Sequence, residues 1–233
     1  MEVQTTQKDI DKTLSKLEIS VSAPIKMDIL ILATSMQNQN GIRQNDYYRY
    51  SRFCNKKIQK LRQLHKLTQG KKKFSKIEIR PENISESKVL LIPILESERK
   101  WAKGMHYKQQ ITNAGKDIKK LRYNITKKFK KASQNSKKLF ELCKIVADTQ
   151  TTLEAEAYHS LIEANYLIFK RNFNSALTLL KKTANIYEKI SHLKDTIESI
   201  TYKEKINAIK TQVRLCLYNL SVIYLTKIYF LHF

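Results

Sequence analysis

The chain has 233 residues, of which 42% are hydrophobic; this supports a real core and excludes wholesale disorder. With only four glycines and three prolines, the composition favours helices joined by short loops over a strand-and-turn protein. We therefore predict an all-α protein.

The formal net charge of +23 is segregated along the chain. Residues 41–80 carry +11, residues 100–144 carry +12, and the rest is neutral. A solvated surface normally mixes the two signs, so two segregated basic stretches indicate a polyanionic partner.

Residues 1–22 are polar and are predicted to form a flexible leader. A helix over 24–40 is predicted next, because Pro24 suits a first helical turn and Gly41 suits the position just past a helix end. The apolar run at 25–36 starts too late for a signal peptide, so none is expected.

Asn45 or Asp46 can cap a basic helix predicted over 45–69. Its apolar residues fall on one stripe: Tyr47, Tyr50, Phe53, Cys54, Ile58, Leu61 and Leu64. A Lys-rich loop follows over 70–85.

A third helix is predicted over 86–111, in which Pro93 either makes a kink or marks the true first turn, and Gly104 weakens the helix locally. A fourth, basic helix is predicted over 117–147.

Residues 152–190 have the small–large spacing of a tetratricopeptide-like helical hairpin, with Ala164 and Ala176 at the close approach and Phe173 at the turn. A last helix is predicted over 194–230. The chain closes in a hydrophobic tail, 221–233, for which a buried helix is expected rather than a membrane span. The fold class is therefore antiparallel helical hairpins in a tetratricopeptide-like bundle.

The sequence offers little for catalysis. The histidines are scattered, and no metal-ligand spacing, phosphate-binding glycine loop or CxxC pair occurs. We expect no enzyme activity, catalytic residue, metal, cofactor or small-molecule substrate. The three cysteines are expected to be reduced and buried, and Glu154 and Glu156 to face solvent.

The basic helix is the strongest functional indication. Arg49, Arg52, Lys56 and Lys60 can line one strip, although like charges at this spacing repel by about 0.2–0.5 kcal/mol per pair. No acid relieves them between Asp46 and Glu78, which favours nucleic-acid binding over a solvated lysine face.

RNA is favoured over DNA, since no helix-turn-helix, zinc finger or zipper is evident and a wide basic surface suits RNA recognised by shape. Tyr48 is the stacking candidate, whereas Tyr47 and Tyr50 are expected in the core. The predicted RNA contacts are Arg43, Tyr48, Arg49, Arg52, Lys56, Lys57, Lys60, Arg62, Lys71, Lys72, Lys73, Lys127, Lys128, Lys130 and Lys131.

Three blocks carry a resemblance to a known family: GIRQNDYYRYSRFCNKKIQKLR, LLIPILESERKWAKGMHYKQ and TLEAEAYHSLIEANYLIFKRNFNSALTLLKKTANIYEKI. In this order they resemble the RNA-binding domain of the 68-kilodalton subunit of the signal recognition particle (SRP). The resemblance implies a helical RNA-binding domain over 23–220 that binds the SRP RNA at a three-way junction.

The resemblance also implies a role in co-translational targeting to the endoplasmic reticulum, in a cytoplasmic particle with nucleolar passage during assembly. Family members are longer and hold a 72-kilodalton subunit through their C-terminal part. This chain ends in LTKIYFLHF, which predicts a truncated version, and binding of that partner is left open.

Two other functions remain open at this point. A protein-interaction scaffold would use a groove inside 152–190 to hold a partner helix, but it leaves the +23 charge unexplained. A peripheral protein on anionic membrane would need bulky apolar residues exposed beside the lysines.

Overall fold

The computed structural model describes residues 24–69, 75–84, 86–111 and 118–231, and the predicted leader 1–22 lies outside them. Seven α-helices are described, in the order α2 (Ile29–Gln39), α3 (Tyr47–Leu64), α4 (Ser87–Ile111), α5 (Ile118–Val146), α6 (Thr149–Phe169), α7 (Phe173–Ser191) and α8 (Thr196–Leu231). Short 3₁₀ turns lie at Ile42–Gln44 (η1) and Pro81–Asn83 (η2). The all-α prediction is confirmed; the described strands are two-residue pieces, β1 (Thr68–Gln69) and β2 (Ser75–Lys76), which pair antiparallel.

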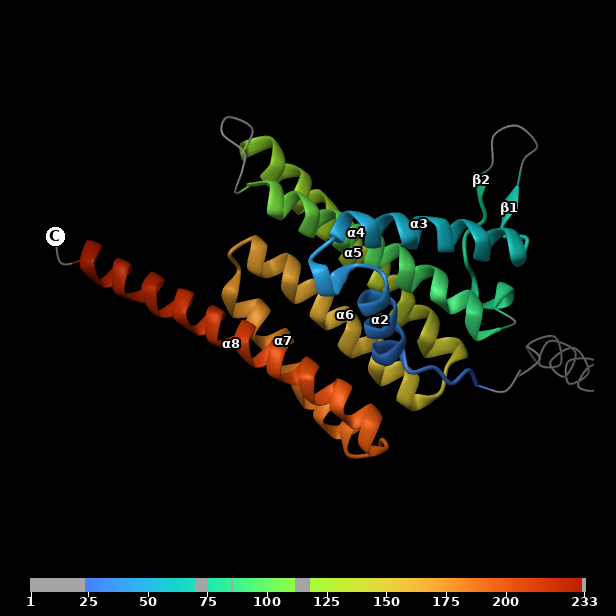
Figure 1. Ribbon diagram of the computed structural model, residues 1–233. Helices are drawn as coiled ribbons and strands as arrows, with labels where there is room; N and C mark the ends of the chain where they lie inside the picture. Colours follow the sequence, from blue (N-terminus) through green and yellow to red (C-terminus); the bar gives the residue numbers. More distant parts are fainter. Residues whose placement is uncertain (1–23, 70–74, 85, 112–117, 232–233) are drawn as a thin grey trace, which may run out of the picture.

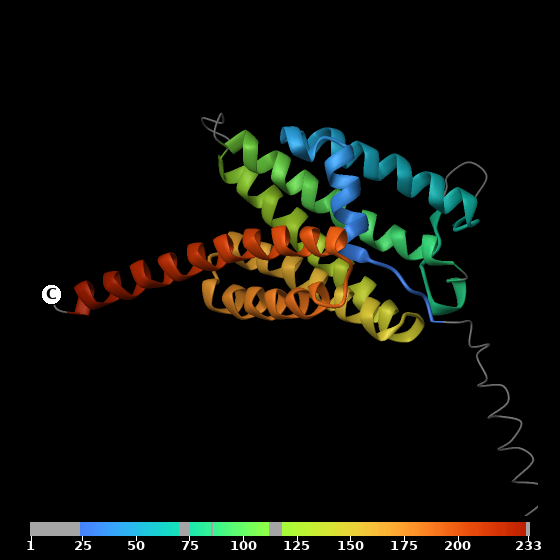
Figure 2. The same cartoon turned by 60° about the horizontal axis from the view of Figure 1, so that its bottom comes forward.

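From α3 to α8, each helix packs mainly on its neighbour in sequence, and α4 lies between α3 and α5 in this series. Figures 1 and 2 show α2 crossing the bundle, where it contacts both α6 and α8. One hydrophobic core joins α2, α3, α4 and α5 to one face of α6, and a second joins another face of α6, with Leu30 of α2, to α7 and α8.

The α6–α7 pair is the predicted helical hairpin. Asn172 caps α7 by accepting a hydrogen bond from the Ser175 N–H, and α7 begins at the predicted turn residue Phe173. Ala164 and Ala176 are fully buried, so the two helices approach closely at small residues as predicted. The facing side chains of α6 and α7 belong to one buried cluster, which also includes residues of α8.

The prediction that a helix begins at Pro24 is wrong, because α2 begins at Ile29. The preceding residues run extended beside the α5–α6 connection, where the Ile25 N–H donates to the Val146 carbonyl and the Asp148 N–H to the Ile25 carbonyl. Thr151 holds the backbone of Met27 in place. Its hydroxyl accepts a hydrogen bond from the Met27 N–H at 2.9 Å and donates one to the Met27 carbonyl at 3.2 Å.

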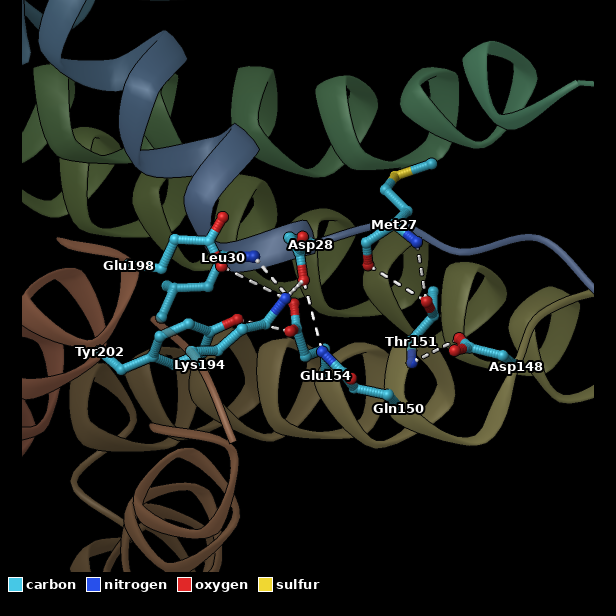
Figure 3. A network of polar contacts seen from close by, with 10 residues as sticks. All are labelled: Met27, Asp28, Leu30, Asp148, Gln150, Thr151, Glu154, Lys194, Glu198 and Tyr202. Atoms are coloured by element: carbon cyan, nitrogen blue, oxygen red, sulfur yellow. Dashed lines mark hydrogen bonds and ion pairs between the residues drawn. The ribbon is translucent and has the colours of Figure 1, made fainter. Parts of the chain in front are cut away.

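Glu154 is buried, which contradicts the expectation that it faces solvent. One carboxylate oxygen accepts the Leu30 N–H at the start of α2, at 3.3 Å, and the other accepts the Tyr202 hydroxyl of α8 (Figure 3). Burial raises the pKa of this carboxyl above its usual value. Glu154 therefore supplies an N-terminal cap for α2 from a residue 124 positions away, and this long-range partner sets where α2 starts.

A neighbouring ion pair ties the same segment to α8. Lys194 contacts Asp28 and lies 3.5 Å from Glu198, so the N-terminal segment, α6 and α8 share one polar network (Figure 3).

Helix α3 ends at Leu64, five residues earlier than predicted. Lys66 adopts a left-handed conformation with φ of 53°, and the Leu67 N–H closes the end on the Arg62 carbonyl. Pro93 lies inside α4, six residues after its start, so it does not mark the first turn. Helix α8 spans Thr196–Leu231, which confirms the predicted last helix over 194–230, but residues 221–223 are exposed and do not form the start of a buried tail as expected.

No helix among the described residues is both long and apolar enough to cross a membrane.

Gly104 is required by packing. An added Cβ would lie 2.5 and 2.7 Å from two ring carbons of Phe129, which is itself buried and packed edge-on against Phe169. The glycine therefore lets α4 approach α5 more closely than any other residue could.

Gly104→Ala should destabilise the protein by about 1–2 kcal/mol, because overpacking costs about 1–3 kcal/mol and exceeds the gain in helix propensity of about 0.5–1 kcal/mol. Thermal denaturation measures the effect. In a Phe129→Leu background the same substitution should cost less, since the ring that it meets is gone. An equal cost in both backgrounds would contradict this account.

Candidate nucleic-acid interface

A tight turn fixes where helix α3 begins, and a stripe of buried side chains fixes which of its faces points inward. Gly41 with φ of 110° and Asn45 with φ of 58° turn the chain, and the Asp46 carboxylate then accepts the Arg49 N–H at 2.9 Å as the helix cap. Tyr50, Cys54, Ile58 and Leu61 are buried as predicted, whereas Leu64 is 65% exposed and does not belong to the stripe.

This inward stripe directs the basic side chains outward. The exposed residues on α3 and the preceding turn include the predicted contacts Arg43, Arg49, Arg52, Lys56, Lys57 and Lys60. The described structure of α3 thus presents five cations to solvent from a single helix, without an acid among them after the cap.

Tyr48 is 54% exposed and lies on the same outer side. The Arg52 guanidinium lies 5.8 Å from its ring centroid, and the His106 ring of α4 lies 5.4 Å from it. An open hollow of about 530 Å³ begins at this ring and is lined by Asn40, Asp46, Tyr48, Arg49, Arg52, Phe53 and Lys56. Tyr50 is fully buried, as predicted, whereas Tyr47 is half-buried and packs edge-on against Trp101.

The back of α3 is held by Glu98, which is 1% exposed. Its carboxylate accepts hydrogen bonds from Tyr50 of α3 at 2.9 Å, from Gln37 of α2 at 2.7 Å and from Tyr158 of α6 at 2.7 Å. Three donors compensate the cost of burying this charge.

The prediction that Arg62 faces a nucleic acid is contradicted by its burial at 6% exposure. Its guanidinium lies 3.2 Å from the Glu96 carboxylate and donates to the Ile77 carbonyl at 2.9 Å. Arg62 thus braces the end of α3 against α4 and the segment after β2. Lys71, Lys72 and Lys73 lie outside the described residues.

The second predicted cluster lies on α5. Lys127, Lys130 and Lys131 are exposed, and Lys128 is half-buried beside basic residues of α4. Burial lowers the pKa of Lys128, and the positive charges of Lys103 and Lys131 lower it further.

Arg99, Lys100 and Lys103 of α4 connect the two clusters, and sequence reasoning missed them. Arg99 donates to Asn55 of α3 at 2.5 Å, while Lys100 and Lys103 lie beside Lys128 of α5. Burial, and then the charges of Arg99 and Lys128 among others, lower the pKa of Lys100 to about 8. The run RKWAK, followed by a stretch with Asp117 as its single acid before Glu141, is the indication that could have found them.

Three helices packed in series, with the turn before α3, thus carry exposed or half-buried cations, and we call this set the basic surface. Its described members are Arg43, Arg49, Arg52, Lys56, Lys57, Lys60, Arg99, Lys100, Lys103, Lys127, Lys128, Lys130 and Lys131. Because α4 lies between α3 and α5, the two predicted clusters meet across α4 rather than directly.

The family model for "RNA-binding signal recognition particle 68" matches residues 42–228, which include all of α3 to α7 and most of α8. The chain belongs to this family. The resemblance noted in the sequence is thereby confirmed.

Curated relatives agree with the family model. The chain is 35% identical over 200 residues to signal recognition particle subunit SRP68 of Dictyostelium discoideum, covering 84% of this chain and 32% of that relative. It is 28% identical over 228 residues to SRP68 of Drosophila melanogaster, covering 92% of this chain and 37% of that relative. The chain thus spans about a third of the length of the curated relatives it matches.

The fold has a counterpart among solved structures. It matches the structure of the SRP68-RBD from Chaetomium thermophilum with a TM-score of 0.69 and 21% identity. The match covers 84% of this chain and 100% of that chain. At this identity the match supports the shared helical fold of the SRP68 family.

Arg62→Met should lower the free energy of unfolding by about 1–3 kcal/mol, because the buried carbonyls and the Glu96 carboxylate lose their partner. Lys60→Met is the matched control and should stay within about 0.5 kcal/mol, because Lys60 is exposed. Urea denaturation measures both variants. On a heparin column the order should reverse, with Lys60→Met eluting earlier and Arg62→Met close to the unaltered protein. Loss of heparin retention by folded Arg62→Met would contradict the structural role.

Proposed function

We propose that this chain is a structured-RNA-binding subunit of the signal recognition particle that binds the SRP RNA at its three-way junction. The observation that carries the proposal is the basic surface, which joins thirteen described cations on and before α3, α4 and α5 in a chain of this family. Through the particle, the chain would support co-translational targeting to the endoplasmic reticulum, with a cytoplasmic location and nucleolar passage during assembly.

The arrangement of the cations supports RNA as the ligand. Helix α3 is braced from behind by Glu98 and at its end by Arg62, so its outward residues form a firm platform. A-form RNA has a deep, narrow major groove that a helix enters where a junction or bulge widens it. Phosphates on either side of such an opening would meet Arg49, Arg52 and Lys56 on α3, and Lys103, Lys128 and Lys131 beyond it.

The chemistry of the contacts follows from the residue types. Arg49 and Arg52 can each make two parallel hydrogen bonds to one phosphate, whereas Lys56, Lys57 and Lys60 supply point charges. The arginines at the N-terminal end of α3 would therefore position the RNA phosphates, and the lysines along the rest of α3 would attract phosphates without fixing their orientation. Binding of the 72-kilodalton subunit of the particle is left open for this chain, as it is from the sequence.

The combined variant Arg49→Ala, Arg52→Ala and Lys56→Ala should weaken binding of an SRP RNA junction by on the order of tenfold or more, since a hydrogen bond to a charged group is worth about 1.5–3 kcal/mol. The slope of log K against log salt should become shallower by about one for each phosphate that the variant no longer neutralises. The matched control removes three exposed cations from α7 and α8, Lys181, Lys189 and Lys203, and should change affinity and slope little.

The decisive comparison sets the junction against the same RNA repaired to a continuous duplex, at two salt concentrations. Preference for the junction that survives the higher salt supports recognition of RNA shape. Equal weakening of both RNAs would mean that the charge acts as a general attraction for polyanions, and the scaffold hypothesis would gain.

Lys100 gives the proposed binding a specific pH dependence. Its pKa of about 8 in the free protein should rise when phosphates neutralise its neighbours, so binding takes up a proton above pH 8. Affinity should be flat below about pH 7 and should fall as the pH rises through 8.

Fluorescence titration between pH 7 and 9 measures this dependence. Lys100→Arg, which stays charged throughout, should give a flatter profile. Identical profiles for Lys100→Arg and the unaltered protein would assign the pH dependence to another group.

A further inference from the structure

The hollow at the N-terminal end of α3 has a composition that phosphate binding does not explain. It has an aromatic wall, Tyr48 and Phe53, and a carboxylate, Asp46, within an otherwise basic surface. In the sequence, Asp46 is the single acid between residues 41 and 77. A carboxylate repels a phosphate, so the part of this hollow beside Asp46 is poorly suited to the RNA backbone itself.

The ring of Tyr48 is positioned rather than free. It sits against the His106 ring at 5.4 Å, with the Arg52 guanidinium 5.8 Å from its centroid, and it still exposes 54% of its surface. An aromatic ring that is supported from a neighbouring helix and open to solvent is the platform on which proteins stack unpaired bases.

The size and polar groups of the hollow fit the same ligand. Its volume of about 530 Å³ lies within the range of about 300–1,000 Å³ that is usual for small-molecule sites. Asp46 accepts hydrogen bonds, which base edges can donate through N–H groups and which phosphates cannot. Arg49 and Lys56 line the same hollow and can hold the phosphate attached to that base.

We propose that this hollow binds one unstacked nucleotide of RNA, with its base on Tyr48 and its phosphate on Arg49 and Lys56. The proposal rests on the proposed function, because it assigns one nucleotide of the bound RNA to a place on the basic surface. It adds that the protein distinguishes RNA with an unpaired base from a continuous duplex through a stacking contact as well as through groove shape.

The test uses two short RNA duplexes, one with a single 2-aminopurine bulge and one fully paired, and measures affinity together with 2-aminopurine fluorescence. Tyr48→Ala should lose about 5- to 150-fold in affinity for the bulged RNA, since stacking on an aromatic ring is worth about 1–3 kcal/mol per base. It should bind the paired duplex as the unaltered protein does. Tyr48→Phe keeps the ring and should keep both the affinity and the fluorescence change.

Tyr123→Ala is the matched control. Tyr123 is 65% exposed on α5 and also lies beside a cation, with the Lys127 ammonium 5.7 Å from its ring centroid, but it does not line the hollow. This variant should bind both RNAs as the unaltered protein does.

The outcomes separate this proposal from the proposed function. Selective weakening of bulged-RNA binding in Tyr48→Ala supports the nucleotide site. Unchanged affinity and fluorescence in Tyr48→Ala, with normal RNA binding by the unaltered protein, would overturn the site and leave RNA binding intact. Failure of the unaltered protein to bind either RNA would overturn both the proposed function and the site. Equal decreases of RNA affinity in Tyr48→Ala and Tyr123→Ala would show that any exposed tyrosine on this surface has the same effect, and this would overturn the site.

Discussion

The basic surface depends on one buried carboxylate. Glu98 sits on α4 and receives hydrogen bonds from α2, α3 and α6, so four helices are joined at a single side chain. A carboxylate in a core is costly unless several donors surround it, and a helix that moved away would leave its charge unsatisfied. This requirement fixes the inner face of α3, and the position of every outward cation on α3 follows from it.

The like charges are tolerated because packing outweighs repulsion. Each buried side chain of the α3 stripe contributes about 1.5–3 kcal/mol, whereas each pair of neighbouring cations costs about 0.2–0.5 kcal/mol on an exposed helix. Charge repulsion opposes packing most directly between α4 and α5, where the close approach at Gly104 places Lys100 and Lys103 beside Lys128. There burial, and then the positive charge of the neighbouring residues, lowers the pKa values of Lys100 and Lys128, and an anion bound beside them would reduce this repulsion.

Local patterns in the sequence predicted the helices well, because their information lies within a few residues. The Asp46 cap, the Tyr50–Leu61 stripe and the alanines of the α6–α7 hairpin are all read from short spacings. Features with distant partners were missed. Glu154 is buried because Leu30 and Tyr202 meet it there, and Arg62 is buried because Glu96 and Ile77 do.

The same reason limited the prediction of the site. The α3 and α5 clusters stand out as runs of lysine and arginine, but the bridge formed by Arg99, Lys100 and Lys103 appears only when α4 is placed between them. The predicted helix start at Pro24 was wrong for a similar reason. Pro24 is compatible with a helix start, yet backbone pairing with residues near 147 keeps that segment extended.

The segregation of charge also bears on how the molecule would meet the proposed RNA. Positive charge is concentrated on α3 to α5, while α6 to α8 mix both signs, so the protein has a strong electric dipole across the bundle. In the field of a polyanion such a molecule is turned before contact, and productive encounters become more frequent. Steering of this kind can raise association rate constants from about 10⁵–10⁷ to about 10⁸–10⁹ M⁻¹s⁻¹ at low ionic strength. In the proposed complex the fold would thus present α3 first to an approaching RNA, and the α6–α7 hairpin and α8 would face away from it.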